Sequence, residues 1–296
     1  MSRGRRVEAE VAFKRAVEIQ PSSPAAQLAL ATFYWAAGRL AEAEPALKHA
    51  IELDARNTAA ERVLATFYLS TGRASEAEAL LKAVADQLKD SRSRFDLADY
   101  YASEQRYDEA SRLLNEVTDQ KDAAQVRLAE LAFAQNRRAD ADRQIDDVLA
   151  RAPKNVEALV LKTGFLVEEN RLDEAVVRAR EAVSADPRSA RAQQMLGLIA
   201  SRRDDVDEAI AAFKEVIRLN PRAQGARLQL ATLQLRKGPS DSSVTLAQDV
   251  VGVQPKDPTA RMVLARALML RGDLTRAEDQ MKDLAREFPN VAAVHA

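Results

Sequence analysis

The chain has no cysteine, so disulfide bonds and thiolate metal sites are excluded. It has only two histidines, His49 and His295, which are far apart in the sequence. No nucleophile elbow, phosphate-binding glycine loop or paired-histidine motif is present. Most carboxylates alternate with arginines, as in RYDEASR, which is typical of ion pairs on helix surfaces. We therefore expect a protein that is not an enzyme and that needs no cofactor or metal.

The sequence also lacks a strong net charge and a long apolar stretch. The 44 basic and 45 acidic residues almost balance, so we expect no nucleic-acid partner. No apolar run approaches the roughly 18 residues that span a bilayer, so we expect no membrane insertion by this segment. The compartment stays open between cytoplasm and periplasm, the latter if the full-length protein carries an N-terminal export signal.

Aromatic residues and glycine are scarce, whereas strong helix formers such as Ala, Leu, Glu and Arg dominate. Proline is also scarce, but five of the ten prolines are spaced 34 residues apart, namely Pro153, Pro187, Pro221, Pro255 and Pro289. A fixed period of this length indicates a repeat protein in which each repeat is one supersecondary unit. The sequence therefore predicts an all-α repeat array.

Three further columns of residues share this register. A small residue recurs at Ala9, Ala43, Ala77, Ala110, Ala141, Ala175, Ala209, Ser243 and Ala277. A leucine recurs at Leu30, Leu64, Leu97, Leu128, Leu196, Leu230 and Leu264, with Lys162 as the exception, and a small residue follows each of these positions. Such columns are typical of two helices that approach closely, because a large side chain would push their axes apart. Tight turns are expected between the helices at Gly38, Gly72, Asn136, Asn170, Gly238 and Gly272.

With these columns the chain resembles a tetratricopeptide-repeat (TPR) array over essentially its whole length. The resemblance implies an α-solenoid of helix-turn-helix units that form a right-handed superhelix. One departure is the missing large aromatic residue early in the first helix, where the chain has Gln27, Glu61, Gln125, Leu159, Gln193, Arg227 and Arg261. The phrases LATFYLSTGRASEAEALLK and LADYYASEQRYDEASRLL are similar to those of long bacterial TPR proteins of envelope or exopolysaccharide export, including exosortase-linked ones.

The register divides the chain into a single solenoid, 1–296. It has a half repeat at 1–23, eight repeats at 24–291 and the start of a further repeat at 292–296, and we interpret it as an excerpt of a longer bacterial protein. The distance from Pro21 to Pro153 falls four residues short of four periods. We therefore expect second helices that end early, near Ala85 to Ser91 and Val117 to Asp122, and irregular stacking near 85–125.

The resemblance implies that the first helices line a concave groove that binds a protein or peptide segment. The candidate groove residues are Thr32, Trp35, Arg62, Thr66, Phe95, Asp99, Glu130, Phe133, Val160, Val167, Gln194, Leu198, Leu228, Thr232, Met262, Arg266 and Met269. Many are apolar, which favours a partner of apolar character; the alternative is that several pack between repeats. Two other functions stay open: a substrate-recruiting or oligomerising accessory segment of a larger enzyme, and end-to-end self-association.

Overall fold

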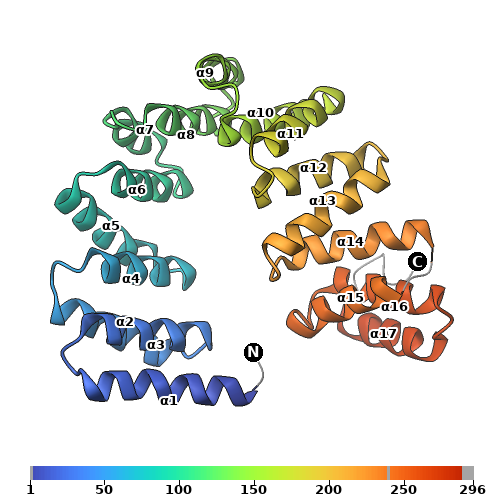
Figure 1. Ribbon diagram of the computed structural model, residues 1–296, viewed down its shortest axis with the longest axis horizontal. Helices are drawn as coiled ribbons and strands as arrows, with labels where there is room; N and C mark the ends of the chain where they lie inside the picture. The colour runs from blue at the N-terminus through green and yellow to red at the C-terminus, as the bar shows by residue number, and fades with distance from the viewer. Residues whose placement is uncertain (1–2, 239–240, 289–296) are drawn as a thin grey trace. The chain divides into compact units, whose positions relative to one another are not determined.

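The computed structural model describes residues 3–238 and 241–288 (Figure 1). Over these residues the chain forms 17 α-helices and no strand, which confirms the all-α prediction. The expected start of a further repeat at 292–296 lies outside them. A single helix, α1 (Arg3–Ile19), precedes eight helix pairs. In chain order the pairs are α2 (Pro24–Ala36) with α3 (Leu40–Leu53), α4 (Thr58–Ser70) with α5 (Ala74–Leu88), α6 (Ser91–Ser103) with α7 (Tyr107–Asn115), α8 (Lys121–Ala134) with α9 (Arg138–Arg151), α10 (Val156–Glu168) with α11 (Leu172–Ala185), α12 (Ala190–Arg202) with α13 (Val206–Leu219), α14 (Gln224–Lys237) with α15 (Asp241–Val253), and α16 (Pro258–Leu270) with α17 (Leu274–Glu287).

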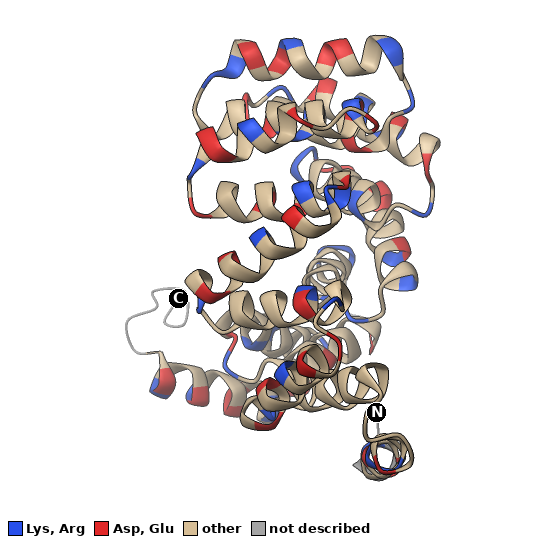
Figure 2. Ribbon diagram, turned by 90° about the vertical axis from the view of Figure 1, so that its left-hand side faces the viewer, with Lys and Arg blue, Asp and Glu red and all other residues tan. Residues whose placement is uncertain are grey.

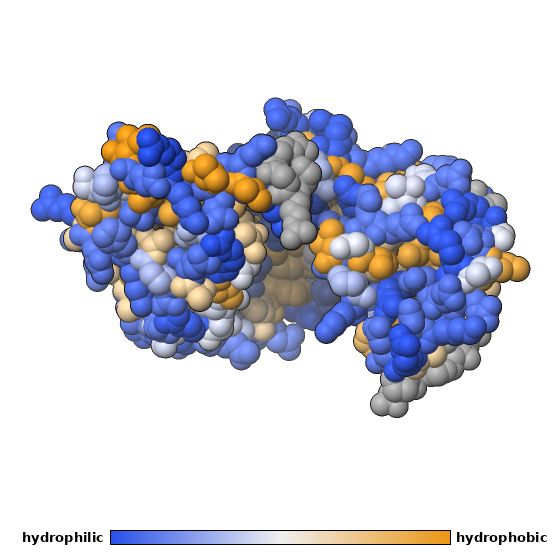
Figure 3. All heavy atoms as spheres, turned by 90° about the horizontal axis from the view of Figure 1, so that it is seen from below, coloured by the Kyte–Doolittle hydropathy of each residue, from blue (hydrophilic) through white to orange (hydrophobic). Residues whose placement is uncertain are grey.

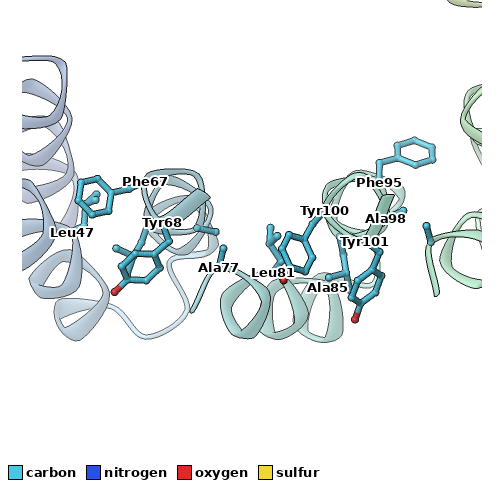
Figure 4. Close-up of a cluster of buried hydrophobic side chains, with 14 of the residues drawn as sticks. Leu47, Phe67, Tyr68, Ala77, Leu81, Ala85, Phe95, Ala98, Tyr100 and Tyr101 are labelled. Atoms are coloured by element: carbon cyan, nitrogen blue, oxygen red, sulfur yellow. The ribbon is translucent and has the colours of Figure 1, made fainter. Parts of the chain in front are cut away.

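The helices belong to two compact units, residues 1–131 and residues 132–296, with the boundary inside α8. Unit 1 has one continuous apolar cluster, whereas the core of unit 2 consists of several smaller clusters. In the unit 1 cluster, Tyr100 and Tyr101 of α6 lie beside Leu81 and Ala85 of α5 (Figure 4). The single solenoid expected over 1–296 stays a prediction.

The small-residue columns are buried in both the first and the second helices. In the second helices, Ala43, Ala77, Ala110, Ala141, Ala175, Ala209 and Ser243 are 0% exposed. The small residues that follow the leucine column in the first helices, such as Ala31 and Thr163, are also fully buried. The columns read from the sequence therefore mark the sites of closest helix approach.

The first helix of most pairs ends in a left-handed turn. Gly38, Gly72, Asn136, Asn170 and Gly272 have φ values between 59° and 84°, as the sequence predicted. Gly238 differs, with φ 130°, and two turns without glycine or asparagine, at Gln105 and Asp204, also have positive φ. After each left-handed residue a backbone N–H closes the helix end, as in the bond from Arg39 N to Tyr34 O at 2.9 Å. This pattern satisfies the last carbonyl groups of the helix.

The two expected early helix ends have different outcomes. Helix α7 has only nine residues, which confirms the early end expected near 117–122. Helix α5 ends inside its expected range, at Leu88, but the expected shortening of this helix is wrong, because α5 has 15 residues. The shortening lies instead in the connection, since α6 begins at Ser91 after only Lys89 and Asp90. The irregular stacking expected near 85–125 stays a prediction.

A repeated polar cluster links successive pairs in unit 1. Each cluster joins a glutamate, a tyrosine and an arginine: Glu10, Tyr34 and Arg39; Glu44, Tyr68 and Arg73; Glu78, Tyr101 and Arg106. The nearest arginine-to-glutamate distances are 2.8, 2.6 and 2.8 Å, and each guanidinium lies 4.3–4.5 Å from the centre of its tyrosine ring. Hydrogen bonds lower the pKa of Glu44 to about 2, with the larger contribution from Arg73 and the smaller one from Lys48. The pKa of Glu78 is lowered to about 2 in the same way by Arg106 and, to a smaller extent, by Lys82. The aromatic face and the ion pair together hold the next helix pair in register.

Unit 2 uses a different set of ion pairs between repeats. An aspartate in the first turn of a second helix pairs with a base at the end of the next first helix: Asp173 with Arg203, Asp207 with Lys237, and Asp241 with Arg271. Basic and acidic residues are accordingly interspersed along the helices (Figure 2).

Lys162, the exception in the leucine column, is held by ion pairs. Its Nζ lies 2.8 Å from Asp142 and 3.0 Å from Asp146, both on α9. Burial opposes the charged form of Lys162, but the hydrogen bonds to Asp142 and Asp146 outweigh it and raise the pKa. The column position is therefore filled by the lysine stem, with its charge neutralised by the preceding helix.

Two glycines within first helices provide a test of this packing. A Cβ at Gly197 would lie 3.0 Å from the ring of Phe213, whereas no atom lies within 4 Å of a Cβ at Gly164. We expect Gly164→Ala to raise the free energy of unfolding by about 0.5–1 kcal/mol through helix propensity. Gly197→Ala should instead lower it by about 1 kcal/mol, because the methyl group overpacks the ring. Urea unfolding measures both, and equal gains in the two variants contradict the assigned helix contact.

Candidate functional site

A cleft lies between α4 and α6 in unit 1, with a volume of about 440 Å³. Side chains from three helices line it, and we call it the α4–α6 cleft: Arg62, Thr66 and Leu69 from α4, Leu81 from α5, and Arg92, Asp96, Asp99, Tyr100 and Ser103 from α6. Helices α4 and α6 are the first helices of successive pairs (Figure 1). The cleft is therefore formed by the helix face that the sequence assigns to the groove.

The apolar part of the cleft has one accessible side chain. Leu69 is 41% exposed, whereas Leu81 and Tyr100 beneath are buried. The hydroxyl of Tyr100 donates a hydrogen bond to Glu78 at 3.2 Å, so its polar group is already satisfied. Leu69 is thus the side chain that an apolar group of a ligand would meet first.

The carboxylates of the cleft already have cationic partners. Asp96 lies 3.2 Å from Nε of Arg62, and Asp99 lies 3.2 Å from Nε of Arg127. At the start of α6, Asp90 accepts a hydrogen bond from the backbone N–H of Ser93 at 2.7 Å. Hydrogen bonds from Ser93 lower the pKa of Asp90, with smaller contributions from Arg62 and Arg92. The two carboxylates that line the cleft, Asp96 and Asp99, are therefore already engaged by arginines.

The hydroxyls of the cleft point back to their own helices. Thr66 donates to the carbonyl of Arg62 at 2.8 Å, and Ser103 donates to the carbonyl of Tyr100 at 2.7 Å. Their oxygens keep lone pairs that can accept hydrogen bonds from a ligand. The cleft can thus combine apolar contact, charge pairing and hydrogen bonding, but it has no group arranged for catalysis.

The structure brings three of the predicted groove residues together in this cleft, namely Arg62, Thr66 and Asp99. Phe95 and Val160 are instead buried, at 7% and 3% exposure. The ring of Phe95 points away from Tyr100 and Tyr101 (Figure 4), and the guanidinium of Arg127 covers it at 4.2 Å. These two side chains therefore belong to the interior.

The other predicted groove residues are spread over both units. Trp35 is half-buried with its ring edge-on to Phe67 at 5.8 Å, and Phe133 stacks on Phe165 at 4.2 Å. Val167, Leu198, Leu228 and Met262 are half-buried, and Thr32, Glu130, Gln194, Thr232, Arg266 and Met269 are exposed. On the face shown in Figure 3, hydrophobic residues form small separate areas among hydrophilic ones.

Six residues that line the cleft were missed from the sequence: Leu69, Leu81, Arg92, Asp96, Tyr100 and Ser103. Leu69 lies 34 residues after Trp35, so the period itself could have found it. Arg92 and Asp96 carry no such signal, because the connection before α6 is shortened.

A second hollow of about 550 Å³ lies in unit 2 at the turn between α12 and α13. It is lined by charged residues and one valine: Arg180, Asp204, Asp205, Val206, Asp207 and Glu208. Each charged group there is already paired, as in the bidentate contact of Arg180 with Glu208 at 2.8 Å. This hollow therefore provides no free group for a ligand.

Two kinds of site were not found in the part of the chain that the structure describes. It contains no group of three or more potential metal ligands among His, Cys, Asp and Glu side chains. None of its helices combines the length and apolar character that crossing a membrane requires.

Comparison with known proteins identifies the class of this fold. The crystal structure of yeast Tom70 is similar with a TM-score of 0.69 and 16% identity, covering 97% of this chain and 62% of that chain. The APC/C hetero-tetramer Cut9–Hcn1 is similar with a TM-score of 0.54 and 14% identity, covering 89% of this chain and 52% of that chain. MamA is similar with a TM-score of 0.53 and 20% identity, covering 60% of this chain and 96% of that chain. At these identities the likeness shows the fold alone: an α-solenoid of helix-turn-helix units. A search of curated proteins found no match.

The particular family follows from the sequence. Family models described as tetratricopeptide repeat match residues 1–48, 34–97, 165–224 and 228–292, which together make up more than half of the chain. The chain belongs to the tetratricopeptide-repeat family. Proteins of this family generally mediate protein–protein interactions, and their fold is typically a non-catalytic scaffold. The bacterial envelope-export context stays a prediction.

Next to the cleft, Glu61 is a buried carboxylate at one of the positions where the aromatic residue is missing. It is 9% exposed, and its Oε2 atom has no hydrogen-bond partner. Arg94 and Arg261, at the corresponding positions of α6 and α16, instead pair with Glu116 at 3.5 Å and Glu287 at 2.7 Å. Burial raises the pKa of Glu61.

We expect Glu61→Gln to stabilise the protein at pH 8 by about 1 kcal/mol, because it removes a buried unpaired charge. The raised pKa means that the folded state of the wild type binds the proton more tightly, so its stability falls as the pH rises through that pKa. The advantage of the variant should therefore shrink at pH 4. Urea unfolding at both pH values measures this effect, with Glu8→Gln at an exposed position as the control. An advantage that does not change with pH contradicts the assignment.

Proposed function

We propose that this chain is a non-enzymatic scaffold that binds a segment of another protein, with the α4–α6 cleft as a contact site. The observation that supports it is an exposed leucine, Leu69, inside a cleft that also presents charged groups and hydroxyl acceptors. Apolar surface with a few polar groups to fix orientation is typical of recognition sites. One of the similar structures is a hetero-tetramer of Cut9 with Hcn1, which agrees with assembly through this fold.

A protein segment suits the cleft better than a small molecule. The accessible lining comes from two successive first helices, α4 and α6, so an elongated ligand can contact both of them. Most of the contact groups lie on regular helices rather than on loops, and such positions change little when a partner binds. We propose that the partner places an apolar side chain against Leu69.

A matched pair of leucines tests this proposal. Leu69 in the cleft and Leu88 at the end of α5 are similarly exposed, at 41% and 38%. We would select a displayed library of random dodecapeptides on the full chain and measure the affinity of the enriched peptides by fluorescence anisotropy. Leu69→Glu should weaken binding at least about tenfold, because it places an unpaired charge against the apolar contact. Leu88→Glu should leave binding unchanged.

Circular dichroism would show that both variants keep their helices. Peptides that bind wild type and Leu69→Glu equally well would overturn the α4–α6 cleft as the contact site.

A further inference from the structure

Arg92 is the one charged residue of the α4–α6 cleft that has no ion pair or hydrogen bond to the described residues. It is exposed and is the second residue of α6. An exposed cation needs no partner for stability, because water solvates it. Its position in the same cleft as an exposed leucine, however, makes it available to a ligand.

The other charged residues of the cleft favour a ligand group with a negative charge over one with a positive charge. An incoming carboxylate can pair with Arg92 without breaking a hydrogen bond or ion pair to the described residues, since only a small electrostatic contribution links Arg92 to Asp90. An incoming cation must compete with Arg62 for Asp96 or with Arg127 for Asp99, where the existing distances are 3.2 Å. At the start of α6, Asp90 opposes an anion, but it caps the helix through Ser93 and does not line the cleft. The charge in the cleft that a ligand can still pair with is therefore the positive charge of Arg92.

Arg92 and Leu69 lie toward opposite ends of the cleft. Arg92 is the second residue of α6, and Leu69 is the twelfth residue of α4, an equivalent helix of the preceding pair. Ten residues of helix correspond to about 15 Å along the axis. An extended chain covers that length with about five residues.

We propose that the α4–α6 cleft binds a protein segment in which an acidic side chain pairs with Arg92 and a large apolar side chain, about five residues away, packs on Leu69. The inference rests on the proposed function, because it assigns the chemistry of the partner at the same site. It predicts that the enriched dodecapeptides share an Asp or Glu at this spacing from a Leu, Ile or Phe. It also predicts that raised salt weakens their binding.

Arg112 on α7 provides a matched control, since it is exposed, has the same charge and lies outside the cleft. Arg92→Gln should weaken the best acidic peptide about three- to tenfold at low salt, as expected for one charge pair in a partly open site. Arg112→Gln should leave its affinity unchanged. Replacing the acidic residue of the peptide by glutamine should abolish the difference between wild type and Arg92→Gln, because the two changes remove the same interaction.

The outcomes separate this inference from the function on which it rests. Enriched peptides that depend on Leu69 but are basic or neutral, or that bind Arg92→Gln as tightly as wild type, overturn the inference alone. Peptides that ignore Leu69→Glu, or a selection that enriches none, overturn both. Displacement of the bound peptide by a single-stranded oligonucleotide at equal charge concentration would also contradict a protein partner.

Discussion

The close approach of two helices at a small residue is the constraint on which this structure depends. Each second helix carries Ala or Ser at one fixed position, and from Ala43 to Ser243 that position is 0% exposed. Because no large side chain separates the helices there, the leucine of the first helix can fill the space beside it, as Leu64 does at 3% exposure. The first helix is thereby fixed in rotation, and its opposite face becomes the surface that can meet a ligand.

Contacts between repeats are less uniform, because each unit uses its own set of charges. In unit 1 an arginine stacks on a tyrosine and reaches a glutamate of the preceding pair, as Arg73 does with Tyr68 and Glu44. In unit 2 the aspartate of one pair reaches the end of the next first helix, as Asp241 does with Arg271 at 3.1 Å. Both sets repeat with the period of the array, so a polar contact that is weak alone recurs at three junctions of its unit.

The 34-residue period predicted the structural features that recur in every repeat, but it could not predict how the surroundings of corresponding residues differ between repeats. The buried small residues and five of the positive-φ turns follow directly from the columns, because helix approach and turn geometry recur in each unit. Arg62 and Phe95 occupy corresponding positions, yet Arg62 lines the cleft and Phe95 is covered by Arg127. That difference depends on a residue of the next helix pair, Arg127, and on the two-residue connection before α6. Neither effect is visible in a single column.

An exposed leucine does not identify a binding site, because single apolar side chains are common on protein surfaces. Leu40 and Leu88 are exposed to similar extents as Leu69, at 43% and 38% against 41%. Leu69 differs because its surroundings combine a cleft with a cation, Arg92, that the described residues leave unpaired. Apolar contact supplies affinity with little direction, whereas a charge at a fixed distance limits which segments can use that contact. Selectivity in this array is therefore expected to depend on the residues that break its period, since the repeated residues are already used to hold the helices together.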